Sequence, residues 1–211
     1  AEPRLVIRDL DARWPDIEAM RGRRGWADVD PGDVAVLVYT SGSTATPKGV
    51  IGPHAQFTFA SREINAVLGY RQDDVVFCRF PMSWDYGLYK VLLSCLGRSE
   101  IVLAGGESDL VLLARMRAVG ATVLPIVPSL ATMITTLVER DTAPPPPIRM
   151  ITNTGAALPA STITRLRAAF PGVRVVRQFG QTECKRISIM PPELDGALPD
   201  SVGKPLPGTT V

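Results

Sequence analysis

Short apolar runs alternate with longer segments of helical period along most of this chain. Six runs are nearly continuous and rich in valine, isoleucine and leucine, as strands buried on both faces should be. They span residues 34–39, 74–80, 100–104, 122–126, 149–153 and 173–178. Apolar stripes with a spacing of three or four residues predict helices within 57–68, 88–96, 112–119, 130–137 and 163–170. This alternation predicts an α/β fold, in which helices flank a layered and largely parallel β-sheet.

The two ends of the chain and one internal stretch depart from this alternation. Residues 1–33 predict a polar lead-in, and residues 34–211 predict the folded core. Residues 142–148, TAPPPPI, cannot form a helix and predict an extended, polyproline-like surface connection. Residues 200–211, DSVGKPLPGTTV, are rich in turn-forming residues, and no further helix or strand is predicted after them. We therefore expect the chain to be one part of a larger domain.

Composition narrows the classes of function. The chain has 211 residues, of which 45% are hydrophobic and 21% charged, and it can therefore bury a core. Its 23 basic and 21 acidic residues are spread without a basic run, which disfavours nucleic acid and anionic membranes as partners. We see no targeting pattern and no apolar run near the ~18 residues of a membrane span, and so expect a cytoplasmic protein. Scattered Cys78, Cys95 and Cys184 predict reduced thiols and no zinc site.

The stretch YTSGSTATPKGV, residues 39–50, concentrates hydroxyl, glycine and lysine residues after the first predicted strand. A strand, a polar loop, a lysine and then a helix can bring backbone N–H groups, hydroxyls and an ammonium group to phosphate oxygens. The common P-loop places glycine before its lysine, whereas Pro47 precedes Lys48 here and Gly49 follows it. Because the same residue types build ordinary turns, composition leaves a phosphate loop and a polar turn equally open.

The order of residues in this stretch resembles the signature loop of the adenylate-forming superfamily. That superfamily includes nonribosomal-peptide adenylation domains, acyl- and aryl-CoA synthetases and luciferases, and Ala45 stands where it has glycine. Other stretches resemble later signatures in the family's order: MSWDYGLYKVLL (82–93), NTGAALP (153–159), RQFGQTECKR (177–186) and SVGKPLPGTTV (201–211). The resemblance implies the middle of the family's large N-terminal domain, without its first part and without the mobile C-terminal domain.

The resemblance implies that ATP activates a carboxylic acid as an acyl-adenylate while pyrophosphate leaves. Such a site must stabilise negative charge that shifts onto the leaving group. The implied phosphate-binding residues are Thr40, Ser41, Gly42, Ser43, Thr44, Lys48 and Gly49. The implied adenine- and AMP-binding residues are Gly155, Ala156, Phe179, Gly180, Gln181 and Thr182. Lys48, Thr182 and Glu183 are the implied catalytic residues, and Glu183 is the implied ligand of Mg²⁺, which prefers oxygen.

Several of these residues have a plainer structural interpretation. Glu183 could be a surface acid, Phe179 a core aromatic and Lys48 a solvated loop charge. Ala45 restricts the loop if a positive φ is needed there, so a catalytically incomplete fragment that binds a nucleotide or a partner stays open as an alternative.

The substrate is expected to be a small carboxylic acid, most simply an amino acid. Asp85 matches the position where relatives that activate amino acids place an aspartate against the substrate ammonium group. Tyr86 and Tyr89 are expected to narrow the pocket. Arg186 could contact an acidic or hydroxylated substrate group or pair at the surface, and we favour the surface pair. The implied acceptor is the phosphopantetheine thiol of an acyl or peptidyl carrier protein, with CoA as the alternative.

Overall fold

The computed structural model describes residues 15, 18–19, 28–40, 47–106, 108–194, 197–198 and 201–211. The chain separates into two compact units, residues 1–30 and residues 31–211. Few residues of the first unit are described, and all the strands named below belong to the second. The helices of the described part of the chain are all too short or too polar to cross a membrane.

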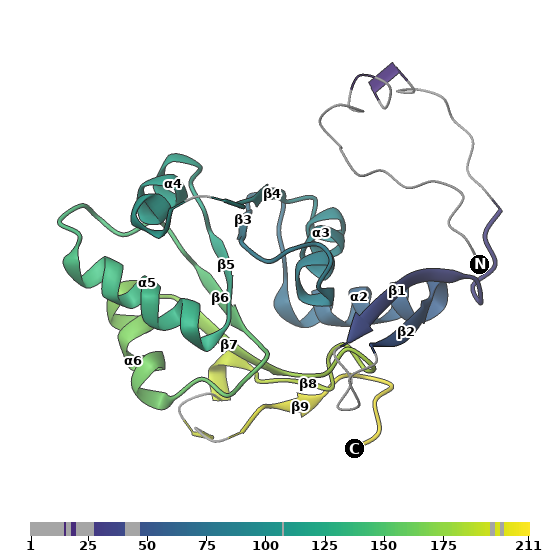
Figure 1. Cartoon of the computed structure of the whole chain (residues 1–211). Helices are drawn as coiled ribbons and strands as arrows, with labels where there is room; N and C mark the ends of the chain where they lie inside the picture. The colour runs from purple at the N-terminus through teal and green to yellow at the C-terminus, as the bar shows by residue number, and fades with distance from the viewer. Residues whose placement is uncertain are drawn as a thin grey trace. The chain divides into compact units, whose positions relative to one another are not determined.

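A seven-stranded sheet forms the centre of the second unit, in the order β4-β3-β5-β6-β7-β8-β9 (Figure 1). Its strands are β3 (Val75–Cys78), β4 (Glu100–Leu103), β5 (Val123–Ile126), β6 (Met150–Asn153), β7 (Arg174–Phe179), β8 (Ser188–Ile189) and β9 (Lys204–Pro205). The strands from β4 to β7 pair in parallel, whereas β8 and β9 are antiparallel additions. The predicted α/β fold with a largely parallel sheet is therefore confirmed.

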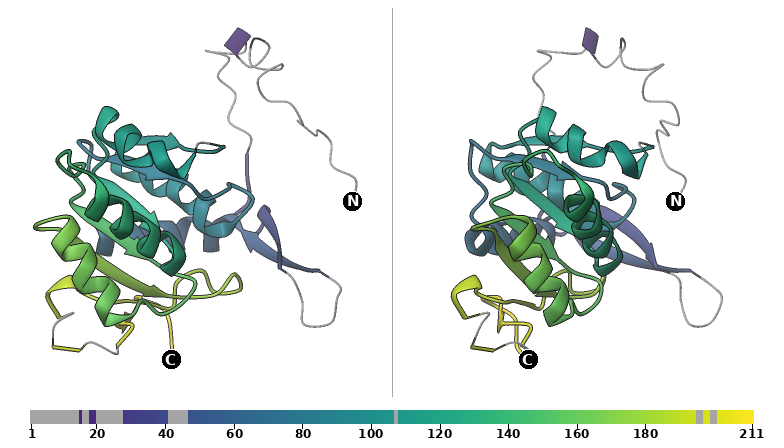
Figure 2. Two further views of the ribbon diagram at one scale, coloured as in Figure 1. Left: turned by 60° about the vertical axis from the view of Figure 1, so that its left-hand side comes forward. Right: turned by 90° about the vertical axis from the view of Figure 1, so that its left-hand side faces the viewer.

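Helices cover both faces of this sheet (Figure 2). They are α2 (His54–Leu68), α3 (Asp85–Gly97), α4 (Leu112–Ala118), α5 (Pro128–Arg140) and α6 (Ala160–Ala169), with 3-10 turns at Asp109–Val111 and Pro192–Leu194. Neighbouring strand residues face opposite sides. Leu124 accordingly packs in one cluster with α4, α5 and α6, and Val123 packs in another with α2 and α3. The five predicted helices are confirmed.

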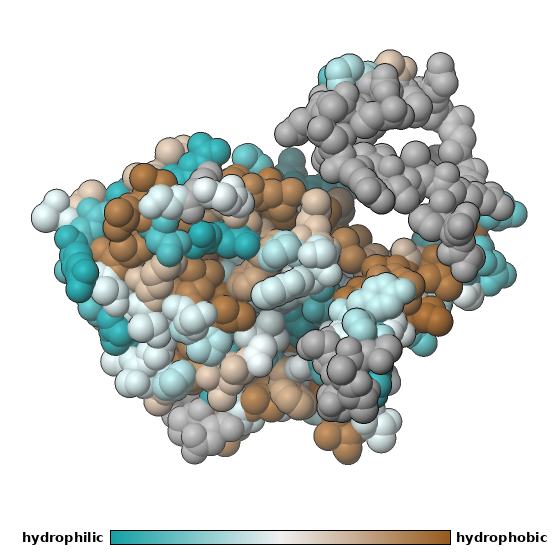
Figure 3. Space-filling model, viewed as in Figure 1, coloured by the Kyte–Doolittle hydropathy of each residue, from teal (hydrophilic) through white to brown (hydrophobic). Residues whose placement is uncertain are grey.

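The first predicted strand lies outside the large sheet, which corrects the expected arrangement around the lysine. β1 (Val34–Thr40) pairs with β2 (Lys48–Pro53) as a separate antiparallel hairpin, in which Thr40 lies opposite Lys48. The lysine therefore begins a strand, and the helix starts only at His54. Leu37 pairs with Ile51 on an exposed apolar face of the hairpin (Figure 3). The sequence analysis missed β8 and β9 because each has only two residues, and it missed β2 because two glycines and a proline interrupt its apolar pattern.

A buried ion pair joins the amino-terminal ends of three parallel strands. Asp74, 1% exposed, precedes β3 and accepts hydrogen bonds from the Arg71 amide (2.8 Å), Thr122 Oγ1 (2.9 Å) and Arg149 Nε (2.6 Å). Arg149 Nη2 also pairs with its second carboxylate oxygen. Burial raises the pKa of Asp74, but these hydrogen bonds outweigh it and hold the pKa below its usual value. The clamp aligns β3, β5 and β6, so that their carboxyl ends form a common edge.

Candidate functional site

Loops that follow β3, β6 and β7 meet at the carboxyl edge of the sheet, where parallel α/β sheets commonly bind ligands. Three neighbouring hollows open there. We name them the β7 hollow, of about 500 Å³, the α3 hollow, of about 210 Å³, and the α2 hollow, of about 360 Å³. The β7 and α3 hollows share Gly155 and Gly180, and the α3 and α2 hollows share Arg186.

The β7 hollow contains four of the residues expected to bind adenine. These are Gly155, Ala156, Phe179 and Gly180. Phe179 stands at the end of β7 with half of its surface exposed, so its interpretation as a core aromatic is wrong. The ring is thus available to stack on a planar ligand.

Two buried amides in the β7 hollow were missed by the sequence analysis. Asn153 ends β6 and Gln178 precedes Phe179 on β7, and both are almost fully buried. Among the described residues, Asn153 Oδ1 and Gln178 Nε2 have no hydrogen-bond partner. A buried amide atom left unpaired costs free energy. Asn153 faces the same side of the sheet as Ile151, whereas Gln178 faces the side of Val176 and accepts from Arg186 Nε, so the two amides do not act on one ligand from the same face. Their only signal in sequence was a polar residue near the end of each apolar run.

Two glycines shape the boundary between the β7 and α3 hollows. Gly155 has a φ of 87°, which side chains rarely adopt. A Cβ atom on Gly180 would lie 2.1 Å from the carbonyl oxygen of Lys185. The resemblance implied that Gly180 allows backbone to approach the base. The structure shows a further reason, because the loop of residues 180–187 folds back against this glycine and Ile187 donates to the Phe179 carbonyl.

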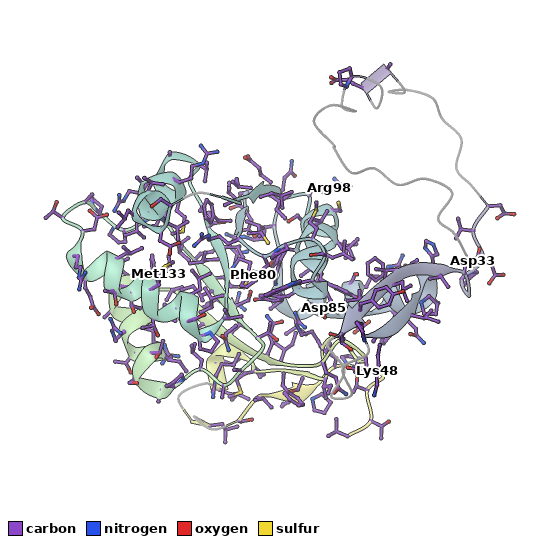
Figure 4. All side chains as sticks on the ribbon, viewed as in Figure 1. Asp33, Lys48, Phe80, Asp85, Arg98 and Met133 are labelled. Atoms are coloured by element: carbon purple, nitrogen blue, oxygen red, sulfur yellow. The ribbon has the colours of Figure 1, made fainter. Side chains whose placement is uncertain are left out.

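The α3 hollow brings together residues expected to bind acid and residues expected to bind AMP. Asp85 begins α3 (Figure 4), and Tyr86 follows it into the core with 5% of its surface exposed. Gln181, Thr182 and Arg186 reach the same hollow from the loop after β7. The hollow is also lined by Phe80, Trp84, Val127 and Thr154. Tyr89 does not line this hollow but the α2 hollow, so only Tyr86 narrows the α3 hollow as predicted.

Arg186 is buried, with 7% of its surface exposed, so the expected surface ion pair is wrong. Its Nε donates to Gln178 Oε1 (2.7 Å), and its Nη1 donates to the Lys185 carbonyl (2.6 Å). Burial lowers the pKa of this guanidinium from its usual value. None of the ion pairs found among the described residues neutralises it. Arg186 therefore brings a positive charge without a direct ion pair to the wall of the α3 hollow, where the carboxylate of Asp85 raises its pKa in part.

The α2 hollow contains Glu183, Lys185 and Tyr89 beside α2 and the last residues of the chain. Lys185 has a φ of 55°, and its Nζ is buried without a hydrogen-bond partner among the described residues. Burial lowers its pKa. Glu183 is exposed. The hollow thus holds the carboxylates of Glu63 and Glu183 and the amine of Lys185, which forms no ion pair among the described residues.

The predicted phosphate loop is only partly described. Ser41, Gly42, Ser43, Thr44 and Ala45 lie outside the described residues. Thr40 and Lys48 form the last described pair of the hairpin before them, and Lys48 is exposed at the start of β2 (Figure 4). Gly49 pairs with Tyr39, and a Cβ there would lie 3.1 Å from Leu37.

Several known proteins are similar to this chain in sequence and in architecture. The solved structure of VinN with L-aspartate is 56% identical, with a TM-score of 0.88 over 95% of this chain and 52% of that one. O-succinylbenzoate CoA synthetase (MenE) from Bacillus subtilis, in complex with ATP and magnesium, is 28% identical, with a TM-score of 0.72 over 84% of this chain and 37% of that one. The L-proline–[L-prolyl-carrier protein] ligase of Streptomyces coelicolor is 32% identical over 86% of this chain and 36% of its own length.

The chain therefore spans about half of the VinN chain, and a little over a third of the other two proteins. Those two are a CoA ligase and an amino-acid ligase by name. The family profile of AMP-binding enzymes matches residues 5–211, which is almost the whole sequence. The chain belongs to the AMP-binding enzyme family, whose members include acyl-CoA ligases and adenylation enzymes.

Proposed function

We propose that this chain forms the nucleotide- and acid-binding core of a ligase that uses ATP to activate an amino acid with a second carboxylate. The product is an acyl-adenylate, and its acyl group then passes to the phosphopantetheine thiol of a carrier protein. One observation carries the choice of substrate: the buried guanidinium of Arg186, which forms no ion pair among the described residues, borders the same hollow as Asp85.

The two ends of such a substrate suit the charges of the α3 hollow. Asp85 is the partner for the substrate ammonium group, and Arg186 is the partner for the second carboxylate. Lys185, whose Nζ is buried without a partner among the described residues, adds positive charge behind Arg186. VinN, 56% identical, has been solved with L-aspartate and, as a separate complex, with 3-methylaspartate. These observations support an amino dicarboxylic acid over a neutral amino acid.

The β7 hollow suits the adenine of ATP. Phe179 offers an exposed ring for stacking, and Asn153 ends β6 at the wall of the same hollow. Ala156 and the shared glycines Gly155 and Gly180 lead from this hollow toward Gln181 and Thr182 in the α3 hollow. We assign the α-phosphate to Thr182. The assigned β- and γ-phosphate partners are Thr40, Ser41, Gly42, Ser43, Thr44, Lys48 and Gly49.

Mg²⁺ is compatible with the groups available at Glu183. No cluster of three or more potential metal ligands occurs in the described part of the chain. Glu183 nevertheless offers exposed carboxylate oxygens beside Thr182, and Mg²⁺ typically takes few protein ligands while phosphate oxygens and water complete its shell. We therefore assign Glu183 as its protein ligand. When bound, the ion neutralises charge on the departing pyrophosphate.

The proposed reaction needs little covalent chemistry from the protein. A carboxylate oxygen of the acid forms a bond to the α-phosphorus, and the bond from that phosphorus to pyrophosphate breaks with its electron pair leaving on oxygen. Asp85 and Arg186 orient the acid, Thr182 holds the α-phosphate, and Lys48 stabilises the charge that develops on the leaving group. Catalysis rests on these positioning and electrostatic effects.

The acceptor thiol can be tested together with the substrate. The protein encoded by the complete gene is assayed for pyrophosphate exchange with aspartate, 3-methylaspartate, asparagine, proline and an aryl acid. We expect exchange with the two dicarboxylic amino acids, and then transfer to a phosphopantetheinylated carrier protein in preference to CoA. Transfer only to CoA would favour a CoA ligase. Silence across the panel, with ATP binding unaffected by Lys48→Ala, would favour the catalytically incomplete binding fragment.

Phe179 provides a test of the adenine assignment. Phe179→Ala is expected to raise the KM for ATP about tenfold, because stacking of a base on an aromatic ring contributes roughly 1–3 kcal/mol. The KM for the acid should change little, and steady-state pyrophosphate exchange measures both. Phe179→Tyr keeps the ring and should retain the wild-type value. Equal KM values for ATP in the alanine variant and the wild type would remove Phe179 from the nucleotide site.

A further inference from the structure

Besides Arg186 and Lys185, a third basic residue, Lys90, lies behind the α3 hollow, and none of the roles assigned above uses it. Lys90 follows Tyr86 by one turn of α3 and is only 1% exposed. Burial of a lysine without a neutralising carboxylate is rare and costly. None of the ion pairs among the described residues includes Lys90.

The contacts of Lys90 lead to the wall of the hollow. Its Nζ donates to Thr152 Oγ1 (3.4 Å) and lies 4.4 Å from the centre of the Tyr86 ring. The Tyr86 hydroxyl in turn donates to the Thr152 carbonyl (2.7 Å) and lies 3.0 Å from Thr152 Oγ1. Arg186 Cζ lies 5.0 Å from the centre of the same ring. Tyr86 thus has a cation in contact from α3 and another from the loop after β7.

We propose that Lys90 is a positioning residue that sets substrate specificity through Tyr86 and Arg186, favouring acids whose far end carries a carboxylate. The inference rests on the proposed function. With its amine buried behind the ring, Lys90 can act on a bound carboxylate only through the field it adds to that of Arg186. In a protein interior such a field acts over several ångströms, because it is screened far less than in water.

The groups around Lys90 predict how this preference depends on pH. Tyr70 after α2, Cys78 on β3, Tyr86 on α3 and Arg186 surround the amine, and Thr152 on β6 is uncharged. Burial lowers the pKa of Lys90, and the charge of Arg186 lowers it further. Burial raises the pKa values of Tyr70, Tyr86 and Cys78, which therefore stay uncharged at neutral pH. Lys90 gains its charge as the pH falls, so the preference should increase toward low pH.

The test compares aspartate with its amide, asparagine, in the protein encoded by the complete gene. Lys90→Met removes the charge and the donor, and Lys90→Gln keeps a donor for Thr152 without the charge. The ratio of kcat/KM for aspartate to that for asparagine should fall about tenfold in both variants, as loss of a buried charge near the carboxylate predicts. The change should lie in the KM for aspartate, and asparagine activation should persist. The ratio should rise with falling pH in the wild type and stay flat in Lys90→Met.

Any result other than these would overturn the inference, and each such result has a different interpretation. An unchanged ratio in both variants removes Lys90 from specificity, and a ratio restored in Lys90→Gln reduces it to a hydrogen-bond donor. A wild-type ratio that stays constant over the whole pH range in which the enzyme remains folded overturns the inference even where a variant does not fold. An equal pH slope in Lys90→Met assigns that slope to another group, such as Lys185. If the wild type activates neither aspartate nor asparagine, the proposed function is rejected together with the inference. The other results reject only the inference about Lys90 and leave the proposed function intact.

Discussion

Replacing Arg186 by methionine is expected to lower kcat/KM for aspartate on the order of 10³-fold, because loss of one partner of a buried charge pair costs roughly 3–5 kcal/mol. Methionine has a similar length, so the wall of the α3 hollow keeps its packing. Activation of asparagine, which has no charge for Arg186 to neutralise, should change by less than about tenfold. Pyrophosphate exchange with each acid at saturating ATP measures both effects.

Arg165 provides the matched control for this substitution. It pairs with Glu139 on the surface, where the two side chains are 38% and 54% exposed. Arg165→Met removes the same charge and should leave both activities close to wild type, since exposed ion pairs contribute little. A proportional loss with aspartate and asparagine in Arg186→Met would contradict a carboxylate-binding role. It would point to disruption of the loop that Arg186 joins to Gln178.

Replacing Asp74 by asparagine is expected to lower the free energy of unfolding at pH 7 by about 2–3 kcal/mol, because Asp74 is buried but Arg149 is partly exposed and can regain water. The carboxylate is inaccessible and accepts from Arg149, Thr122 and the Arg71 amide. Asparagine can accept some of these bonds, but leaves the Arg149 guanidinium without its counter-charge. For a chain of this size we expect the melting temperature to fall by roughly 10 °C. Thermal and urea unfolding, followed by circular dichroism, measure the change.

The same carboxylate predicts how stability depends on pH. The folded pKa of Asp74 is held below its usual value, so its contribution is present above the unfolded pKa of about 3.9 and is lost as the pH falls through the folded value. Asp74→Asn should therefore lose less stability than the wild type on acidification. Asp73→Asn is the control, because the Arg71–Asp73 pair is 57% and 73% exposed. Equal melting temperatures for the two variants would rule out the clamp as a major stabilising contact.

Much of the fold could be predicted from local patterns. The residues of β5 and β6 are buried at every position, because helices cover both faces of those strands, and all but Thr152 and Asn153 are apolar. The hairpin could not be predicted in the same way. The residues after Lys48 contain two glycines and a proline, and they form a strand only because β1 lies beside them. Pairing between strands depends on partners distant in sequence, which periodicity does not report.

The candidate site likewise contains residues that the sequence predicted and residues that only the structure revealed. Resemblance led to Asp85, Thr182 and Phe179, and the structure places all three in two adjoining hollows. Burial could not be read from residue type, so the surface was the natural expectation for Arg186. Lys90 carried no signal at all, since a lysine within a helix is usually solvated. Its role follows only from Tyr86 and Thr152, which surround its amine.

The sequence by itself determined the alternation of strands and helices, the family, and the order of the nucleotide signatures, because each depends on residues close together in the chain. The tertiary structure alone decided which charges remain without an ion pair. Parallel strands bring the loop after β7 against α3, and there Arg186 and Lys90 lose water without forming an ion pair among the described residues. That imbalance arises from desolvation at a contact between distant segments, and it is the physical basis for expecting an acidic substrate.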